Sequence, residues 1–149
     1  MLKKNDNAVL LLIGVGEKEE EVRKQVNDLR ISDKVRFLGN RSDVNELYQV
    51  MDAFVLPSFF EGIPVVGVEA QYAGLPCFFS DKVPKEVSVA QNCKFIGLNE
   101  SAKTWSEIIL ENISIRKSCE EKILKSQYNI DIAYEKMIEY YERLAESIE

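Results

Sequence analysis

Residues 58–81 read SFFEGIPVVGVEAQYAGLPCFFSD, a loop that turns into an almost wholly apolar helix. Pro64 suits the first helical position, because the N–H that proline lacks is not needed there. Gly74 favours a left-handed C-cap, and Pro76 cannot continue a helix, so this pair marks where the helix stops. The helix between them has no broad polar face, which predicts that it is buried.

Two carboxylates stand eight residues apart across this turn, Glu61 in the loop and Glu69 in the helix. A carboxylate inside an apolar helix is costly unless a hydrogen bond satisfies it, so Glu69 indicates a functional site. The first turn of a helix offers free N–H groups and the positive end of the helix dipole, which suit a diphosphate. We therefore predict that Ile63, Val65 and Val66 bind a diphosphate through their backbone. Glu69 would then accept hydrogen bonds from ribose hydroxyls, and Glu61 would lie near the group that the diphosphate carries.

The same spacing also has an ordinary explanation. Glu69 could lie at a solvent edge of the helix and Glu61 could be a plain turn residue, because glutamate is a common residue. The spacing alone leaves both explanations open.

The composition is that of one small α/β domain. The 149 residues are 46% hydrophobic and 30% charged, and a net charge of −6 argues against a nucleic-acid or anionic-membrane partner. The sequence has neither a long apolar run nor a hydrophobic N-terminal segment, so we expect no transmembrane segment and no signal peptide. Three cysteines without a motif fit reduced thiols in the cytoplasm. The absence of histidine excludes a Ser-His-Asp triad and a zinc–histidine site, and we expect no metal.

Strand and helix patterns alternate over residues 1–100. The apolar runs at 8–13, 35–38, 53–56 and 76–79 are short and nearly unbroken, as in parallel strands covered on both faces, and 94–96 is a candidate fifth. Helical patterns lie at 17–30, with a stripe of Val22, Val26 and Leu29, and at 42–50. This alternation predicts a Rossmann-like, doubly wound parallel sheet in a single domain spanning residues 1–149.

Residues 101–149 are predicted to form C-terminal helices. On the first of them Trp105, Ile108 and Ile109 face inward, and residues 114–126 form a second, more polar helix. The last helix has an apolar stripe at alternating steps of four and three residues: Ile130, Tyr134, Met137, Tyr141, Leu144 and Ile148. Over so short a length we expect this stripe to pack back onto the domain and not to form a zipper.

These segments, in this order, resemble the donor-binding C-terminal half of the retaining group 1 nucleotide-sugar glycosyltransferases, which have the GT-B fold. Glu61 and Glu69 match the Glu-x7-Glu signature of that family. The further resembling segments are AVLLLIGVG at 8–16, VRFLG at 35–39, AFVLPS at 53–58, GLP at 74–76 and Ser80-Asp81. The match runs from about residue 8 to residue 105, and SDKVPKEV at 80–87 is similar to members that build bacterial exopolysaccharide or capsule.

The resemblance implies a reaction and roles for the signature residues. Members transfer a sugar from a nucleotide diphosphate to an acceptor hydroxyl with retention, usually without an obligatory metal, so the nucleotide sugar is a substrate and no cofactor is expected. Glu61, the expected catalytic residue, would contact the donor sugar, and Glu69 would bind the ribose. The sugar and phosphates would be contacted through the backbone of four residues: Gly62, Ile63, Pro64 and Val65.

The loops after the first two predicted strands supply further candidates. In the family the turn at Gly14 and Gly16 lines the cleft beside the donor, and the counterparts of Asn40 and Arg41 border the nucleobase. The Gly-x-Gly turn also suggests a dinucleotide fingerprint, but its third glycine position is Glu19. Carboxylates at a helix N-terminus repel a pyrophosphate, so we rank that alternative below the sugar nucleotide. Asn40 and Arg41 can equally be a plain turn.

The resemblance also suggests that this chain is an N-terminally truncated piece. The acceptor domain is absent, and so are the Arg and Lys that neutralise the diphosphate, so we expect the chain to be inactive alone. One alternative is a non-catalytic donor-binding module that works with a separate acceptor-domain chain, and through it lies peripherally at the inner face of the membrane. Another is a remnant without a present function.

In the resembled fold, truncation would remove a central strand between those at 8–13 and 53–56. The two strands could then pair directly, another chain could lend a strand or pack across the gap, or the domain could be only marginally stable. We expect direct pairing, because it restores the backbone ladders of both strands. The apolar surface left bare would favour a homodimer, formed through the helix at 130–148.

Overall fold

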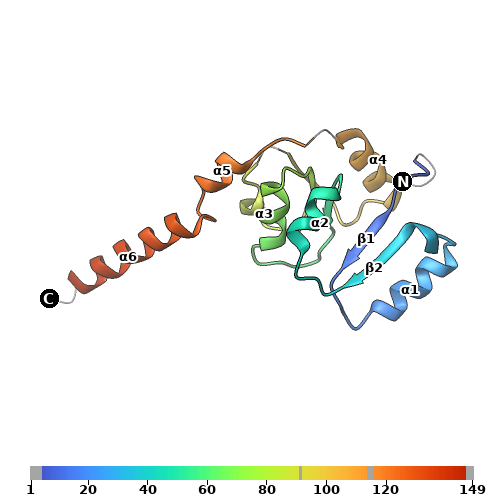
Figure 1. Ribbon diagram of the computed structural model, residues 1–149, viewed down its shortest axis with the longest axis horizontal. Coiled ribbons are helices and arrows are strands. Elements are labelled where there is room, and N and C mark those ends of the chain that lie inside the picture. The colour runs from blue at the N-terminus through green and yellow to red at the C-terminus, as the bar shows by residue number, and fades with distance from the viewer. Residues whose placement is uncertain (1–4, 91, 114–115, 147–149) are drawn as a thin grey trace. The chain divides into compact units, whose positions relative to one another are not determined.

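The computed structural model describes residues 5–90, 92–113 and 116–146 and shows alternating strands and helices (Figure 1). The strands are β1 (Leu10–Ile13), β2 (Val35–Gly39), β3 (Phe54–Leu56), β4 (Cys77–Ser80) and β5 (Cys93–Ile96). The helices are α1 (Glu19–Asp28), α2 (Val44–Val50), α3 (Val65–Tyr72), α4 (Ala102–Asn112), α5 (Glu120–Leu124) and α6 (Ile130–Glu146). Short 3-10 turns η1 (Ser32–Lys34) and η2 (Lys85–Val87) complete the order. All five predicted strands are therefore confirmed.

The chain divides after Glu46 into two compact units. In the first, β1 and β2 pair in parallel, from Leu10 opposite Val35 to Ile13 opposite Gly39. Helix α1 forms the crossover between the two strands. Within its predicted apolar stripe, Val26 is buried and Leu29 is 68% exposed.

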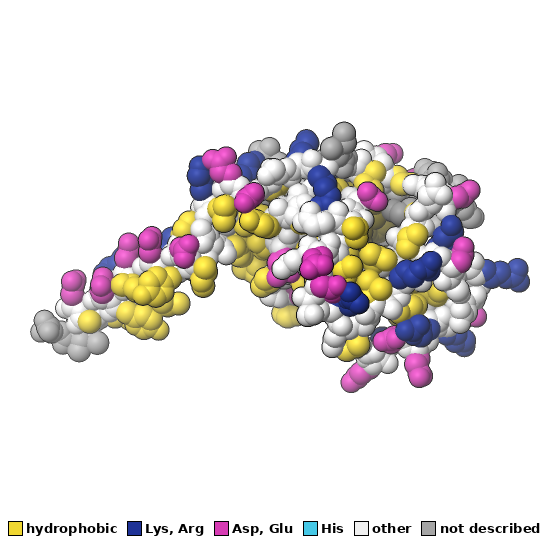
Figure 2. Space-filling view, viewed as in Figure 1, with side chains coloured by type: hydrophobic (Ala, Val, Ile, Leu, Met, Phe, Trp, Pro, Cys, Tyr) yellow, Lys and Arg dark blue, Asp and Glu magenta, His cyan; other side chains and the backbone are white. Residues whose placement is uncertain are grey.

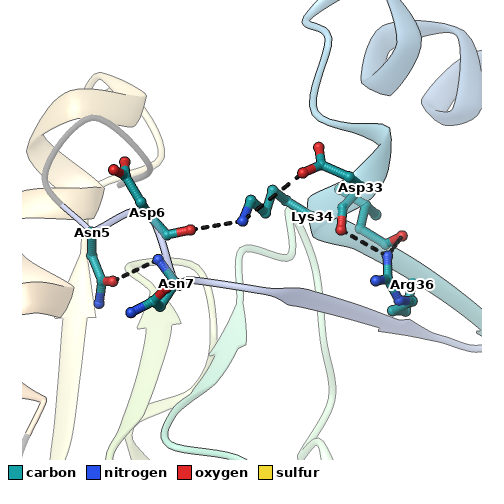
Figure 3. A network of polar contacts seen from close by, with 7 residues as sticks. Asn5, Asp6, Asn7, Asp33, Lys34 and Arg36 are labelled. Atoms are coloured by element: carbon teal, nitrogen blue, oxygen red, sulfur yellow. Dashed lines mark hydrogen bonds and ion pairs between the residues drawn. The ribbon is translucent and has the colours of Figure 1, made fainter.

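Polar contacts tie the start of the first unit to η1 (Figure 3). The Lys34 ammonium donates to the backbone carbonyl of Asp6 at 2.8 Å and lies 3.9 Å from the Asp33 carboxylate. The Arg36 guanidinium donates to the carbonyl of Asp33 at 3.0 Å. These contacts join the segment before β1 to the turn that leads into β2.

The second unit contains a parallel sheet in the order β3-β4-β5. All four residues of the central strand β4 are buried, and β3 and β5 pair with it from Phe54 opposite Cys77 and from Cys77 opposite Cys93. Phe78, Ile96 and Ile109 form a buried cluster against which Ala53, Trp105 and Ile108 pack. The prediction that α4 faces inward through Trp105, Ile108 and Ile109 is confirmed.

Helix α3 ends as its sequence predicts. Gly74 has φ +79°, its N–H donates to Gln71 at 2.9 Å, and the Leu75 N–H donates to Ala70 at 3.0 Å, which is a Schellman motif. The N-terminus is shifted by one residue, because Pro64 precedes the helix and its carbonyl accepts the Gly67 N–H at 2.9 Å.

A buried amide holds α3 against the segment that contains η2. Gln71 is 0% exposed, and its Nε2 donates to the carbonyls of Gly67 and Val87 at 2.8 Å each. Its Oε1 accepts the N–H groups of Val89 and Ala90 at 3.0 Å each. We call this set the Gln71 hub. All four hydrogen-bonding sites of the amide are used, which is the condition for burying it without a penalty.

The side chain of Arg116 joins the C-terminal ends of α2 and α3. Its guanidinium donates to the backbone carbonyl of Ala73, the C-cap of α3, at 2.8 Å, and to the backbone carbonyl of Met51, which follows α2, at 2.7 Å. It also donates to the carbonyl of Tyr48 in the last turn of α2. Carbonyls at helix C-termini lack partners within the helix, so a guanidinium there satisfies them and complements the helix dipole.

Two sequence predictions are wrong in the second unit. The helix expected at 114–126 is only α5, while residues 114 and 115 lie outside the described ranges. Helix α3 is not wholly buried, since Val65 is 63% exposed. Strands β1 and β3 belong to different units, so their direct pairing stays a prediction.

Helix α6 does not pack back onto the domain, because none of its residues is buried. Figure 2 shows hydrophobic side chains gathered along one of its faces and acidic side chains on another. Ile148, the last residue of the predicted stripe, lies outside the described residues. A homodimer through this face stays a prediction. Over the described ranges, no helix has the combination of length and apolar character that crossing a membrane requires.

Candidate active site

Glu61 lies in the loop between β3 and α3, at the carboxyl edge of the three-stranded sheet, where parallel α/β sheets bind ligands. Its carboxylate is half-buried and accepts the Ser58 hydroxyl at 2.8 Å between Oγ and Oε1. The backbone carbonyl of Ser58 in turn accepts the hydroxyl of Ser80, a fully buried residue at the end of β4, at 2.5 Å. Two neighbouring strands therefore hold the loop that carries Glu61.

The first turn of α3 is open to solvent. Val65 and Val66 are 63% and 43% exposed, and the preceding Gly62 and Ile63 are exposed as well. The backbone N–H groups at 65 and 66 precede Gly67, whose N–H already donates to Pro64. This turn thus presents free donors and the positive end of the helix dipole, as the sequence predicts.

Glu69 finds its partner on a neighbouring helix. The hydroxyl of Tyr48 lies 3.4 Å from Glu69 Oε2 and 3.2 Å from the carbonyl oxygen of Val66. Burial of Tyr48, and then the nearby charge of Glu69, raise the pKa of the phenol well above its usual value of 10. The hydroxyl therefore stays protonated and can donate. The sequence predicts that Glu69 needs a hydrogen bond but gives no sign that Tyr48 supplies it.

The remaining candidates belong to the first unit. Gly14 has φ +115°, and its N–H donates to the carbonyl of Gly39 at 2.8 Å, which brings the loops after β1 and β2 side by side. Such a φ favours glycine, so this turn needs the residue it has. Gly16 is exposed, as are Asn40 and Arg41. The structure thus places the candidates in two groups, one in each unit.

Arg41 already has a partner in its own turn. Its Nε donates to Asp43 Oδ1 at 2.7 Å, and the guanidinium lowers the pKa of that carboxyl. The pair is exposed, and exposed ion pairs contribute little to stability. Because the two residues are only two positions apart, the pair can stabilise the turn itself, and Arg41 can equally be a ligand contact.

No group of three or more histidine, cysteine, aspartate or glutamate side chains in the described part of the chain has a geometry that could hold a metal ion. A hollow of about 400 Å³ lies at the opposite, amino edge of the sheet, where Pro76, Asn92 and Lys94 are among its lining residues. It is separate from the loop of Glu61, because that loop follows the carboxyl end of β3.

Residues 1–127 match the sequence model of the family described as glycosyl transferases group 1. The chain belongs to this family. It is 41% identical to a putative glycosyltransferase, EpsF, of Bacillus subtilis over 63% of this chain and 24% of that protein. It is 32% identical to the N,N'-diacetylbacillosaminyl-diphospho-undecaprenol alpha-1,3-N-acetylgalactosaminyltransferase of Campylobacter jejuni over 99% of this chain and 40% of that one.

Solved structures of other proteins share the fold. Sucrose-phosphate synthase from Thermosynechococcus elongatus superposes with a TM-score of 0.75 and 18% identity over 93% of this chain and 39% of that one. WaaG, a glycosyltransferase involved in lipopolysaccharide biosynthesis, superposes with a TM-score of 0.61 and 21% identity over 87% and 32%. The predicted fold, the Rossmann-like C-terminal half of a GT-B fold, is confirmed. This group 1 chain spans between a quarter and two-fifths of the length of these proteins.

Proposed function

We propose that this chain is the donor-binding part of a retaining glycosyltransferase of cell-surface polysaccharide synthesis and that it binds a nucleotide-diphosphate sugar. One observation carries the proposal. Two half-buried carboxylates, each beside a hydroxyl donor, lie on either side of the open first turn of α3. Carboxylates accept bonds from sugar and ribose hydroxyls, and the turn between them presents donors for a diphosphate.

Each part of the site has a proposed role. Glu61 contacts the donor sugar, and the backbone at 62–65 contacts the sugar and the phosphates. Glu69 accepts hydrogen bonds from the ribose. When the bond between the anomeric carbon and the diphosphate oxygen breaks, charge develops on the leaving diphosphate. The acceptor oxygen bonds to the anomeric carbon in its place, and the proton of the acceptor hydroxyl passes to the leaving diphosphate. The N–H groups and dipole of α3 then stabilise that charge.

The names of related proteins support the class of substrate. One relative, 34% identical over 50% of this chain, is a UDP-Gal:alpha-D-GlcNAc-diphosphoundecaprenol alpha-1,3-galactosyltransferase of Escherichia coli. Another, 38% identical over 48% of this chain, is an N-acetyl-alpha-D-glucosaminyl L-malate synthase of Bacillus anthracis. Sugar and acceptor therefore differ between these relatives, and the part of the site that we propose is the part common to nucleotide-diphosphate sugars.

Uridine or guanosine diphosphate is expected to bind this chain without added metal, with a dissociation constant on the order of millimolar, about 4 kcal/mol. In an NMR titration with EDTA present, the shifts should centre on residues 62–69. Replacing Glu69 with glutamine should weaken binding about tenfold, because a hydrogen bond to a charged group contributes about 1.5–3 kcal/mol. Glu111→Gln, on α4, is the matched control and should leave affinity unchanged.

The same titration also tests the first unit independently, through Gly14, Gly16, Asn40 and Arg41. Shifts at Asn40 and Arg41 would add them to the donor contacts. Saturable shifts confined to residues 14–21 would instead favour a dinucleotide site at the turn after β1 and would contradict the proposal.

The 149-residue chain alone is expected to transfer no sugar. Acceptor positioning and the cationic groups that neutralise a leaving diphosphate each contribute orders of magnitude to such reactions, and we place neither in this chain. Incubation with radiolabelled nucleotide sugars and lipid-linked acceptors should give background counts. Turnover above background that is lost in Glu61→Gln would show that the chain is a complete enzyme.

A further inference from the structure

We propose that Tyr48 is a positioning residue, whose hydroxyl holds the Glu69 carboxylate in the orientation that binds the ribose of the donor. This inference deepens the proposed function and rests on it. Glu69 projects from α3, whereas Tyr48 lies in α2, 21 residues earlier in the chain.

Tyr48 is buried and packed against neighbouring residues. Its side chain is only 2% exposed, and its ring packs edge-to-face on Phe54, with ring centroids 6.2 Å apart. Its backbone carbonyl accepts a hydrogen bond from Arg116, which also bonds the carbonyls of Met51 and Ala73. The ring therefore has little freedom, and its hydroxyl has a fixed direction toward α3.

The hydroxyl has one proton and two acceptors within reach. The carbonyl of Val66 is 3.2 Å away, and Glu69 Oε2 is 3.4 Å away. A helical carbonyl at this position already accepts the N–H four residues later, so it does not depend on the phenol. A carboxylate gains more from a donor than a neutral carbonyl does. The Tyr48 hydroxyl therefore donates its proton to Glu69, in preference to the Val66 carbonyl, when the carboxylate is turned toward it.

The two oxygens of the Glu69 carboxylate have different surroundings. Tyr48 approaches Oε2, while Oε1 makes no hydrogen bond to any residue in the described part of the chain. We therefore assign Oε1 to the ligand hydroxyl. Without the phenol, the half-buried carboxylate could turn among several rotamers, and ordering it on binding would reduce affinity.

Tyr48 could instead be a purely structural residue that joins α2 to α3, and the ligand distinguishes the two roles. A positioning residue affects only ligands that bind Glu69 through ribose hydroxyls. A structural residue would affect any nucleotide held by the first turn of α3. A ligand pair that differs only in the ribose hydroxyls therefore separates the two roles.

The test compares uridine diphosphate with 2′,3′-dideoxyuridine diphosphate on wild type, Tyr48→Phe and Tyr72→Phe by NMR titration. Tyr48→Phe should weaken binding of the ribonucleotide about three- to tenfold and leave binding of the dideoxynucleotide within about twofold. Tyr72→Phe is the matched control, because it also removes a phenol–carboxylate bond from α3, to Glu120 at 3.1 Å. It should change neither affinity. Thermal melting of all three proteins checks that the fold is kept.

Glu69→Gln and the double variant Tyr48→Phe/Glu69→Gln complete a double-mutant cycle with Tyr48→Phe and the wild type. If Tyr48 acts through Glu69, adding Tyr48→Phe to Glu69→Gln should cost little further affinity. An equal loss for both nucleotides, or no loss in Tyr48→Phe, would overturn the inference while leaving the proposed function in place. No loss in Glu69→Gln would overturn the proposed role of Glu69 itself.

Discussion

Replacing Gln71 with methionine is expected to lower the free energy of unfolding by about 2–6 kcal/mol, because a buried polar group left without a partner costs about 1–3 kcal/mol and each further hydrogen bond lost costs about 0.5–1.5 kcal/mol. Methionine has nearly the same volume but no amide. The change removes the Gln71 hub and leaves the Ala90 N–H without its partner. The Val87 carbonyl and the Val89 N–H each lose their bond to the amide and keep only the bond between them, at 3.1 Å. The Gly67 carbonyl keeps its bond within α3.

Urea denaturation followed by tryptophan fluorescence measures this loss. Trp105 is the single tryptophan of the chain and packs on the core of the second unit, so its emission reports on the unit that contains the hub. Gln49→Met, an exposed glutamine in α2, is the matched control and should change stability by less than about 0.5 kcal/mol. If Gln71→Met lost less than about 1 kcal/mol, the hub would not be the link that holds α3 to the η2 segment.

Replacing Arg116 with methionine is expected to lower the free energy of unfolding by about 2–4 kcal/mol. Each hydrogen bond to a charged donor contributes about 1.5–3 kcal/mol, and the sum over three bonds is reduced because Arg116, Met51 and Ala73 are only half-buried and water can replace part of what is lost. The guanidinium donates hydrogen bonds to the carbonyls of Tyr48, Met51 and Ala73 at the ends of α2 and α3. Arg116→Lys should recover only part of the loss, because an ammonium is a point charge and cannot span three carbonyls as a planar fork does.

The same denaturation experiment measures this effect. Arg143→Met is the control, because Arg143 contacts Glu139 one turn earlier in α6 through an exposed ion pair worth about 0.3–0.5 kcal/mol and a long bond of 3.3 Å from Nε to the Glu139 carbonyl. Equal losses in Arg116→Met and Arg143→Met would mean that the cation at the two helix ends is no more than a surface charge.

Local features of the sequence predicted most of the fold. Short apolar runs bounded by glycine, proline or charged residues predicted all five strands. The burial on both faces expected for them holds along the whole of β4 only, since β1 has no buried residue. Gly74 and Pro76 predicted the end of α3, since few residues take a left-handed φ. The loop carrying Glu61 and the turn before Glu69 were predictable for the same reason.

The contacts that hold the site were not predictable. Tyr48 meets Glu69 across 21 residues, Arg116 meets Tyr48 across 68, and Ser80 meets Ser58 across 22. No local period marks a side chain whose partner lies so far along the chain. Gln71 did leave a signal, because an uncharged polar residue inside an apolar helix must find partners for its amide. The polar segment at 114–126 contains no comparable signal for where a helix begins and ends, and its helix in the structure is the shorter α5.

Strand edges affect how the protein behaves at high concentration. In the described residues β1 and β3 each have one hydrogen-bonded neighbour, and an unpaired strand edge is a template for extended segments of other molecules. Where one edge pairs with a different edge of the next copy and the chain of contacts does not close on itself, the result is precipitation and not a defined oligomer. The net charge of −6 opposes them by keeping copies apart. Salt weakens that repulsion, which makes ionic strength the condition that governs how long the chain stays dispersed.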